Sequence, residues 1–145
     1  MKPVDIKVKY FTDKIDKLEK IEQGGWIDLR LAEDVHMDAG EFRLLPLGVA
    51  IQVPVGYETI IAPRSSTYKR WGIVQANSIG VVDQAYCGPN DQLLLPAIAL
   101  VDTDIPVNTR ICQFRIQKEQ PKLNFITVDE LDNPNRGGLG STGTT

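Results

Sequence analysis

Asn77-Ser-Ile-Gly-Val-Val-Asp-Gln-Ala-Tyr-Cys-Gly88 is the stretch of the chain that most constrains its fold. The apolar residues before Asp83, bracketed by Gly80 and Gly88, predict a tight hairpin whose arms lie in a β-sheet. A charged carboxylate costs free energy among apolar neighbours unless it is paired or lies in a hydrated pocket. Two interpretations of Asp83 therefore stay open from this stretch alone: a cap for the turn, or an acid held in a cleft to work on a proton.

The whole chain has the composition of an ordinary soluble globular domain. Its 145 residues are 42% hydrophobic and 24% charged, which suits a single domain with a real core. No apolar run approaches the roughly 18 residues of a membrane span, and the N-terminus lacks a signal-peptide core. We therefore expect a cytoplasmic protein. The net charge of −3 argues against a broad electrostatic grip on nucleic acid.

Residue types that usually build metal centres and disulfide frameworks are scarce. Cys87 and Cys112 are the only cysteines, and they make neither a disulfide framework nor a zinc-ligand pattern. The single histidine, His36, lies in an acidic stretch and is interpreted as a solvated surface residue. A small phosphorylated ligand stays open, because a few local cations and a metal ion suffice to hold it.

Short apolar or alternating runs separated by Gly, Pro and Asn predict an all-β fold, a mostly antiparallel barrel or jelly roll. Pro46 suggests an edge position or a bulge within its strand. A turn at residues 54–57 is expected to join that strand to the next in a hairpin. The predicted strands are residues 4–10, a strand starting at 26–29, and then 42–53, 58–62, 72–76, 92–101, 109–117 and 123–128.

One short helix is predicted just after Pro63, where the β pattern breaks. Ser65 and Ser66 are candidate caps for a helix that carries Tyr68 and Lys69. Residues 12–23 are rich in lysine and acids, and they fit either one or two helical turns or a solvated loop.

The C-terminal residues 131–145 are rich in Gly, Ser and Thr and offer little to bury. A disordered terminus is one interpretation of this composition. The run that follows Arg136 also has the composition of a phosphate cradle, because glycines let backbone N–H groups approach an oxyanion and hydroxyls and a guanidinium complete the cage.

Five segments, taken together and in this order, closely resemble the five motifs of trimeric dUTP pyrophosphatases (dUTPases) of Gram-positive bacteria and their phages. They are residues 26–29, 63–66, 77–88, 110–113 and 138–143. The resemblance implies a distorted jelly-roll domain at residues 1–131 and a flexible arm at 132–145 that closes over a neighbouring active site. It also implies a homotrimer that hydrolyses dUTP to dUMP and pyrophosphate with Mg²⁺, which limits uracil incorporation into DNA and supplies dUMP for dTMP synthesis.

The resemblance assigns the nucleoside half of the site to the central stretch. Asp83 is expected to orient the water that attacks the α-phosphorus and to take its proton. The ring of Tyr86 is expected beneath the deoxyribose, where a 2′-hydroxyl would collide with it. Asn77 and the backbone of Val81 and Val82 are expected to pair with the uracil edge, in a donor–acceptor pattern that is reversed for cytosine.

The phosphate half is assigned to other motifs. Arg64 and Ser65 match positions that hold the α- and β-phosphates, and Ser66 adds a hydroxyl or an N–H. Gln113 matches a phosphate-facing amide, with an ordinary sheet-surface glutamine as the alternative. Asp28 matches an acid placed near the metal through water rather than as a direct ligand, because Mg²⁺ keeps several waters and binds mainly through substrate phosphates.

The C-terminal arm departs from the family pattern at two points. Arg136 is expected at the γ-phosphate in a register that is not fixed, and Ser141 and Thr142 complete the phosphate cage. Leu139 stands where the family places a phenylalanine over the uracil. Residues 92–95, the other source of a lid ring, also lack an aromatic residue, so an aliphatic lid is predicted.

Two alternative functions are compatible with this scaffold. A dCTP deaminase needs a glutamate on the strand after the hairpin glycine, and residues 88–101 contain Asp91 as their only acid. A regulatory phage protein that binds other proteins is the second alternative. Asp83, Arg64 and Ser65 argue against a protein that has lost catalysis.

Overall fold

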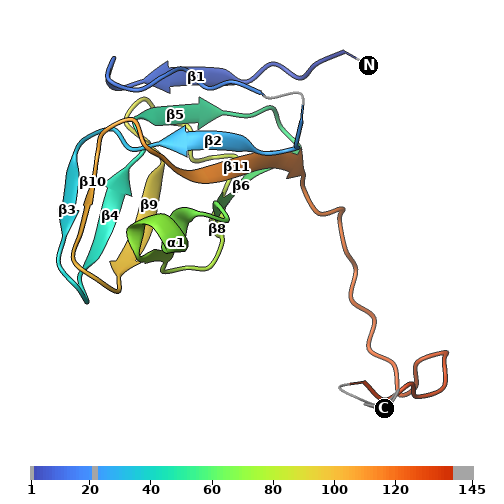
Figure 1. The fold of residues 1–145 in the computed structure, drawn as a ribbon. Coiled ribbons are helices and arrows are strands. Elements are labelled where there is room, and N and C mark those ends of the chain that lie inside the picture. Colours follow the sequence, from blue (N-terminus) through green and yellow to red (C-terminus); the bar gives the residue numbers. More distant parts are fainter. Residues whose placement is uncertain (1, 21–22, 139–145) are drawn as a thin grey trace.

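The computed structural model describes residues 2–20 and 23–138. In this part of the chain, eleven strands form four small antiparallel sheets, and one short helix accompanies them (Figure 1). The elements are β1 (Lys7–Tyr10), β2 (Ile27–Arg30), β3 (Val35–Met37), β4 (Phe42–Pro46), β5 (Val49–Gln52), β6 (Tyr57–Pro63), α1 (Thr67–Trp71), β7 (Ile73–Gln75), β8 (Gly80–Val82), β9 (Leu94–Ala99), β10 (Thr103–Ile105) and β11 (Arg110–Lys118).

The sheets pair strands that are far apart in the sequence. Their orders are β2-β11-β6-β8, β4-β9-β7, β1-β5 and β10-β3. Alternation decides which side of each strand is buried: in β9, Leu95, Ala97 and Ala99 are buried while the residues between them face outward. One core cluster draws buried side chains from most of these strands. The predicted nearly all-β fold with one short helix is confirmed.

The predicted single strand over residues 42–53 is wrong. It is broken at Leu47 and Gly48, so β4 pairs with β9 and β5 pairs with β1. Gly48 has φ +74°, and a Cβ there would lie 2.9 Å from Cδ1 of Ile15. The chain turns at Gly48 because that backbone conformation and that close approach both favour glycine. Pro46 ends β4 at a sheet edge, as predicted.

The predicted hairpin across residues 54–57 is also wrong. The turn itself forms, with the N–H of Tyr57 donating to the carbonyl of Pro54 at 3.2 Å and Gly56 at φ +91°. The two strands that it joins lie in different sheets, because β6 pairs with β11 and β8 instead of with β5. Tertiary pairing over a long sequence distance replaces the local ladder.

Only one arm of the predicted hairpin at residues 77–88 is a strand. β8 pairs with β6, and the chain after Val82 forms turns. The N–H of Tyr86 donates to the carbonyl of Asp83 at 2.9 Å, and the N–H of Gly88 donates to a carboxylate oxygen of Asp91 at 2.8 Å. These hydrogen bonds within the turns pair the backbone N–H groups of the segment in which the sequence predicts a second strand.

α1 lies where the sequence predicts the helix, but its cap differs. Ser66 occupies the N-cap position without a side-chain cap hydrogen bond. The hydroxyl of Thr67 instead accepts from the N–H of Arg64 at 2.9 Å and donates to the carbonyl of Ile111 at 2.8 Å. The predicted serine caps are therefore wrong, and a buried threonine ties the helix to β11.

The remaining segments differ in how well local sequence patterns predict them. Residues 12–20 form a loop with Ile15 buried. The sequence pattern does not predict the short paired strands β3 and β10. The strand predicted at 123–128 is absent from the structure, where Phe125 is 89% exposed and the chain after β11 leaves the body of the fold (Figure 1). Among the described residues no helix is long and apolar enough to cross a membrane.

Candidate active site

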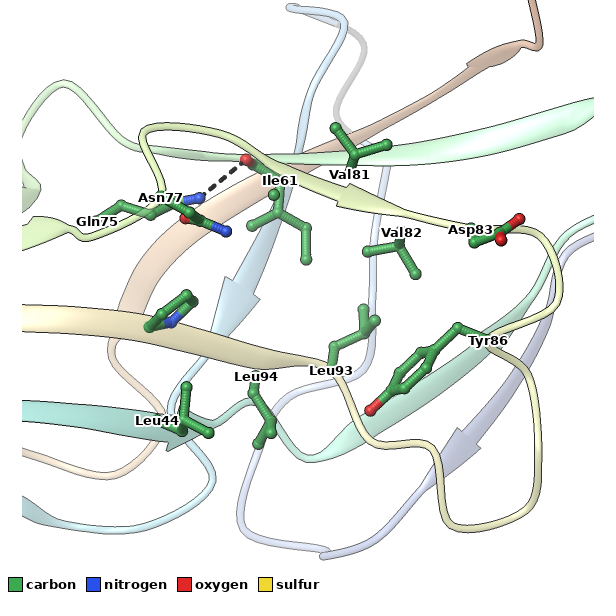
Figure 2. Close-up of a pocket in the computed structure, with 12 residues that line it drawn as sticks. Leu44, Ile61, Gln75, Asn77, Val81, Val82, Asp83, Tyr86, Leu93 and Leu94 are labelled. Atoms are coloured by element: carbon green, nitrogen blue, oxygen red, sulfur yellow. Dashed lines mark hydrogen bonds between the residues drawn. The ribbon is translucent and has the colours of Figure 1, made fainter.

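A pocket of about 360 Å³ opens beside β8 and the turn that follows it. β8 lies at the edge of its sheet, and its partner β6 fixes it through the pairs Ile61 with Gly80 and Thr59 with Val82. Figure 2 shows side chains from both sides converging on this space. The lining residues are Leu44, Ile61, Gln75, Asn77, Gly80, Val81, Val82, Asp83, Tyr86, Leu93, Leu94 and Pro96.

The structure brings together all the residues that the sequence assigns to the nucleoside half. Asn77, Val81, Val82, Asp83 and Tyr86 line the same pocket. Asp83 directly follows β8 and is exposed, so its carboxylate is open to solvent at the pocket wall. The arrangement offers a strand edge, a carboxylate and an aromatic ring within one cavity.

Tyr86 is held in place by its hydroxyl group. The hydroxyl donates to the carbonyl of Gln92 at 2.7 Å, and Tyr86, which lines the pocket, is 38% exposed. Figure 2 shows its ring among the side chains of the pocket. Partial burial raises the pKa of Tyr86 above its usual 10.0, with a smaller contribution from the charge of Asp91. The phenol therefore stays protonated at neutral pH, and the ring is a fixed apolar surface.

The opposite side of the pocket is aliphatic. Leu44 from β4, Leu94 and Pro96 from β9, and Leu93 just before β9 complete it. Within the described lining, Tyr86 is the single aromatic ring. Leu93 and Leu94 belong to the segment from which the sequence predicts an aliphatic lid, and that lid stays a prediction.

A second group of predicted residues gathers at the far end of β6. Asp28 on β2 accepts from Arg64, whose Nε lies 3.1 Å from Oδ1, and faces Arg110, whose Nη1 lies 3.6 Å from Oδ2. Gln113 pairs with Asp28 across β2 and β11, and its side-chain amide donates to the carbonyl of Pro63 at 3.0 Å. Ser65 and Ser66 follow Arg64 directly, and Ser65 is exposed.

The two groups lie toward opposite ends of β6. Val82 pairs with Thr59, and Arg64 lies five residues beyond Thr59 along the same direction. At roughly 3.3 Å per residue, Arg64 is about 16 Å from the Asp83 end of β8. None of the phosphate-binding candidates is among the described residues that line the nucleoside pocket.

The family model for dUTPase matches residues 17–145.

The chain belongs to the dUTPase family.

It is 54% identical to the SPbeta prophage-derived deoxyuridine 5'-triphosphate nucleotidohydrolase YosS of Bacillus subtilis (strain 168), over 97% of this chain and 99% of that protein. The family predicted from the five segments is confirmed, and a match of this length extends well beyond the motifs themselves.

Solved dUTPase structures share the fold. A mutant dUTPase of Staphylococcus bacteriophage 80alpha with dUpNHpp matches with a TM-score of 0.77 and 19% identity, over 97% of this chain and 99% of that chain. A mutant dUTPase of phage phi11 of S. aureus, whose structure concerns a structural Mg(II) ion, matches with a TM-score of 0.74 and 16% identity, over 88% and 99%. The predicted jelly-roll-like class is thereby confirmed for this member of the dUTPase family.

The described residues contain no group of three or more His, Cys, Asp or Glu that could hold a metal ion. Both oxygens of Asp28 face guanidinium groups, which repel a cation. Asp83 is the single acid in the described pocket lining. Such a donor set fits a Mg²⁺ carried mainly by triphosphate oxygens better than one held by a protein cage. The predicted indirect role of Asp28 toward the metal stays a prediction.

Several candidate residues lie outside the described part or were missed. Leu139, Ser141 and Thr142 fall outside the described residues, and Arg136 lies in the exposed segment after β11. Arg110 lies in the motif at residues 110–113, but that motif alone does not predict its place beside Asp28. The sequence pattern could have identified Gln75 as a candidate site residue. It is a polar residue at a position of β7 that alternation places on the same side as buried Ile73.

Proposed function

We propose that this member of the dUTPase family hydrolyses dUTP to dUMP and pyrophosphate by attack of water on the α-phosphorus. The observation that carries the proposal is the single pocket that holds Asp83, Asn77, the edge of β8 and the ring of Tyr86. This reaction limits uracil incorporation into DNA and supplies dUMP for dTMP synthesis.

The exposed edge of β8 recognises the uracil through hydrogen bonds. In the described part of the chain β8 pairs with β6 on one side only, so the backbone groups on its other side have no strand partner. Backbone N–H and C=O groups of Val81 and Val82, with the Asn77 amide, pair with O4 and N3–H of uracil. Cytosine presents a bare N3 and an amino group, so the same pattern leaves unpaired buried groups and rejects it.

Tyr86 and Asp83 serve the sugar and the reaction. The deoxyribose packs on the Tyr86 ring, and a 2′-hydroxyl would collide there. Asp83 accepts a hydrogen bond from the attacking water and takes its proton as the new bond from oxygen to the α-phosphorus forms. The bond from the α-phosphorus to the bridging oxygen breaks, and pyrophosphate leaves with the electron pair.

The phosphates require residues from a second subunit. Because Arg64, Ser65, Ser66 and Gln113 are not among the described residues that line the nucleoside pocket, and Arg64 lies about 16 Å along the strand direction from the pair of Thr59 and Val82, we place them at the nucleoside pocket of a neighbouring copy in a homotrimer with interface active sites. The exposed apolar side chains of β4, Phe42 at 57% and Leu44 at 51%, support a surface that another subunit covers.

The C-terminal arm, residues 132–145, completes the proposed site. It closes over the pocket of a neighbour and carries Arg136 to the γ-phosphate, with Leu139, Ser141 and Thr142 around the nucleotide. The described residues that follow β11, from Glu119 to Gly138, are all exposed, which supports a segment that packs elsewhere than on its own body. Removing residues 132–145 should abolish most activity and leave the fold of the remainder intact.

Mg²⁺ is the proposed cofactor. When bound, it neutralises charge on the triphosphate and aligns the phosphates, while the residues named above bind the base and sugar and hold the water. We place the protein in the cytoplasm, with dUTP as its small-molecule partner and no direct nucleic-acid partner.

Substrate turnover tests this function. Pyrophosphate release with Mg²⁺ is measured for dUTP, dCTP, dTTP and UTP, together with ammonia release from dCTP. We expect rapid release from dUTP alone. Ammonia release from dCTP would instead establish the deaminase alternative, which residues 88–101 disfavour because they contain no glutamate.

A further inference from the structure

Gln75 is a buried polar residue at the back of the nucleoside pocket. It ends β7, where its neighbour in the alternation, Ile73, belongs to the core. Gln75 is only 8% exposed and is one of the residues that line the pocket. Burying an amide costs free energy that an apolar residue of similar size would not, so a polar side chain here suggests a specific role.

The orientation of the Gln75 amide is fixed by the backbone. Its Nε2 donates to the carbonyl oxygen of Ile61 at 3.1 Å (Figure 2). Because a carbonyl oxygen only accepts hydrogen bonds, the amide nitrogen must face Ile61 and Oε1 must be the other end of the group. Gln75 therefore presents an acceptor, not a donor, to any further partner.

That acceptor is unsatisfied. Oε1 of Gln75 is buried and has no hydrogen-bond partner within the described part of the chain. A buried acceptor without a donor is costly, and each such atom in a native structure needs a reason. The oxygen is satisfied when a neighbouring donor turns toward it.

Asn77 supplies a suitable donor. Gly80, which pairs with Ile61, leaves room at the start of β8: a Cβ there would lie 3.5 Å from Nδ2 of Asn77 and 3.7 Å from Nε2 of Gln75. The two side-chain amides thus adjoin the same point of the pocket wall. Asn77 is exposed, so its side chain can turn, whereas the amide of buried Gln75 is fixed.

We propose that Gln75 is a positioning residue that sets the orientation of the Asn77 amide and thereby the preference for uracil over cytosine. The bound nucleotide brings Nδ2 of Asn77 onto Oε1 of Gln75, and Oδ1 of Asn77 then accepts from N3–H of uracil. An asparagine amide alone carries both a donor and an acceptor and could turn to suit either base. The carbonyl of Ile61 removes that freedom through Gln75. This inference rests on the proposed placement of uracil beside Asn77.

The test compares Gln75→Met, which keeps the volume and loses both polar ends, with Gln117→Met on an exposed part of β11. For Gln75→Met we expect KM for dUTP to rise about tenfold, kcat to stay within about twofold, and the kcat/KM ratio of dUTP over dCTP to fall by about 10-fold or more. Gln117→Met should match the wild type. An unchanged ratio, or equal losses for both nucleotides, would overturn the proposal.

Two further measurements keep the test decisive. In the wild-type protein, dUMP should shift and protect the ¹⁵N side-chain amide signal of Asn77 while pyrophosphate does not; an unprotected Asn77 amide in the dUMP complex would overturn the proposal even if Gln75→Met fails to fold. Asn77→Ala is measured alongside. If Asn77→Ala binds dUMP with normal affinity, the proposed placement of uracil beside Asn77 is wrong. If Asn77→Ala binds dUMP weakly but Gln75→Met keeps the normal preference for dUTP over dCTP, only the proposed role of Gln75 is wrong.

Discussion

Oδ1 of Asp28 lies 3.1 Å from Nε of Arg64, so an acid of β2 fixes a guanidinium just beyond the end of β6. Arg64 also donates from Nη1 to the carbonyl of Arg110 at 3.3 Å. The guanidinium is thus oriented from two sides before any nucleotide is bound. Orientation of this kind lowers the cost of ordering a charged side chain around a triphosphate.

Asp28→Asn should therefore reduce kcat/KM for dUTP by about 10-fold to 100-fold, because Arg64 loses its charged partner and its fixed direction. The pair is partly exposed, at 30% and 20%, so the free energy of unfolding should fall by no more than about 1 kcal/mol. Steady-state kinetics and thermal unfolding measure both. Asp16→Asn, which removes an exposed partner of Arg30, is the control and should keep normal activity. An Asp28→Asn enzyme of normal kcat/KM contradicts this role.

Gly80→Ala should narrow the nucleoside pocket without unfolding the protein. Its Cβ would lie at ordinary contact distance, 3.4 Å from Cβ of Ile61 and 3.5 Å from Nδ2 of Asn77. We expect KM for dUTP to rise about tenfold because the methyl group occupies space at the uracil edge, with a nearly unchanged melting temperature. Gly25→Ala, where nothing lies within 4 Å, should behave as the wild type. Normal KM for Gly80→Ala would place the base elsewhere.

His36 joins two strands through a pair of acids. Its Nδ1 lies 2.7 Å from Oδ1 of Asp104 on β10, and its Nε2 lies 2.9 Å from Oδ1 of Asp38. Hydrogen bonds to Asp104 and then to Asp38 raise the pKa of His36 above its ordinary 6.5. The stabilisation by charged His36 is therefore complete below the unfolded pKa and is lost as pH rises through the higher folded pKa.

The melting temperature of the wild type should accordingly fall, relative to that of His36→Gln, as pH rises from about 6 to about 8. Thermal unfolding at matched ionic strength across this range makes the comparison. Parallel pH profiles for the two proteins would show that the pair of acids contributes nothing to stability.

The interface site proposed for a homotrimer gives a prediction about trimers that mix two variants. Asp83→Asn and Arg64→Ala should each be inactive alone. When the two are co-expressed and assort at random, about one site in four combines an intact Asp83 from one subunit with an intact Arg64 from its neighbour. Roughly a quarter of wild-type activity should return. A mixture as inactive as its parents would mean that one chain supplies both residues.

The sequence places the nucleoside candidates in one pocket because they are neighbours along the chain. Asn77, Val81, Val82, Asp83 and Tyr86 lie on β8 and its two turns, so local structure alone brings them together. The motif order also leads to the family, which explains why the fold class is predictable even though no single strand identifies it.

What the sequence misses depends on tertiary partners. The break at Gly48 is set by its approach to Ile15, from a loop far away in the sequence. β3 and β10 are too short to show a period of their own and exist as a pair. Residues 123–128 have the apolar composition of a strand but no described strand to pair with. Likewise, the sequence does not show that Gln75 Oε1 lacks a partner. That follows from the tertiary structure, where the amide nitrogen of Gln75 on β7 donates to the carbonyl of Ile61 on β6.

Replacement of the one acid in the described pocket lining tests the central claim most directly. Asp83→Asn keeps the shape of the side chain and removes the acceptor for the proton of the attacking water. Pyrophosphate release from dUTP should fall by about 10²-fold to 10⁴-fold in kcat, while the affinity for a non-hydrolysable dUTP analogue stays within a few-fold of the wild type. Turnover by Asp83→Asn at close to the wild-type rate would contradict the mechanism.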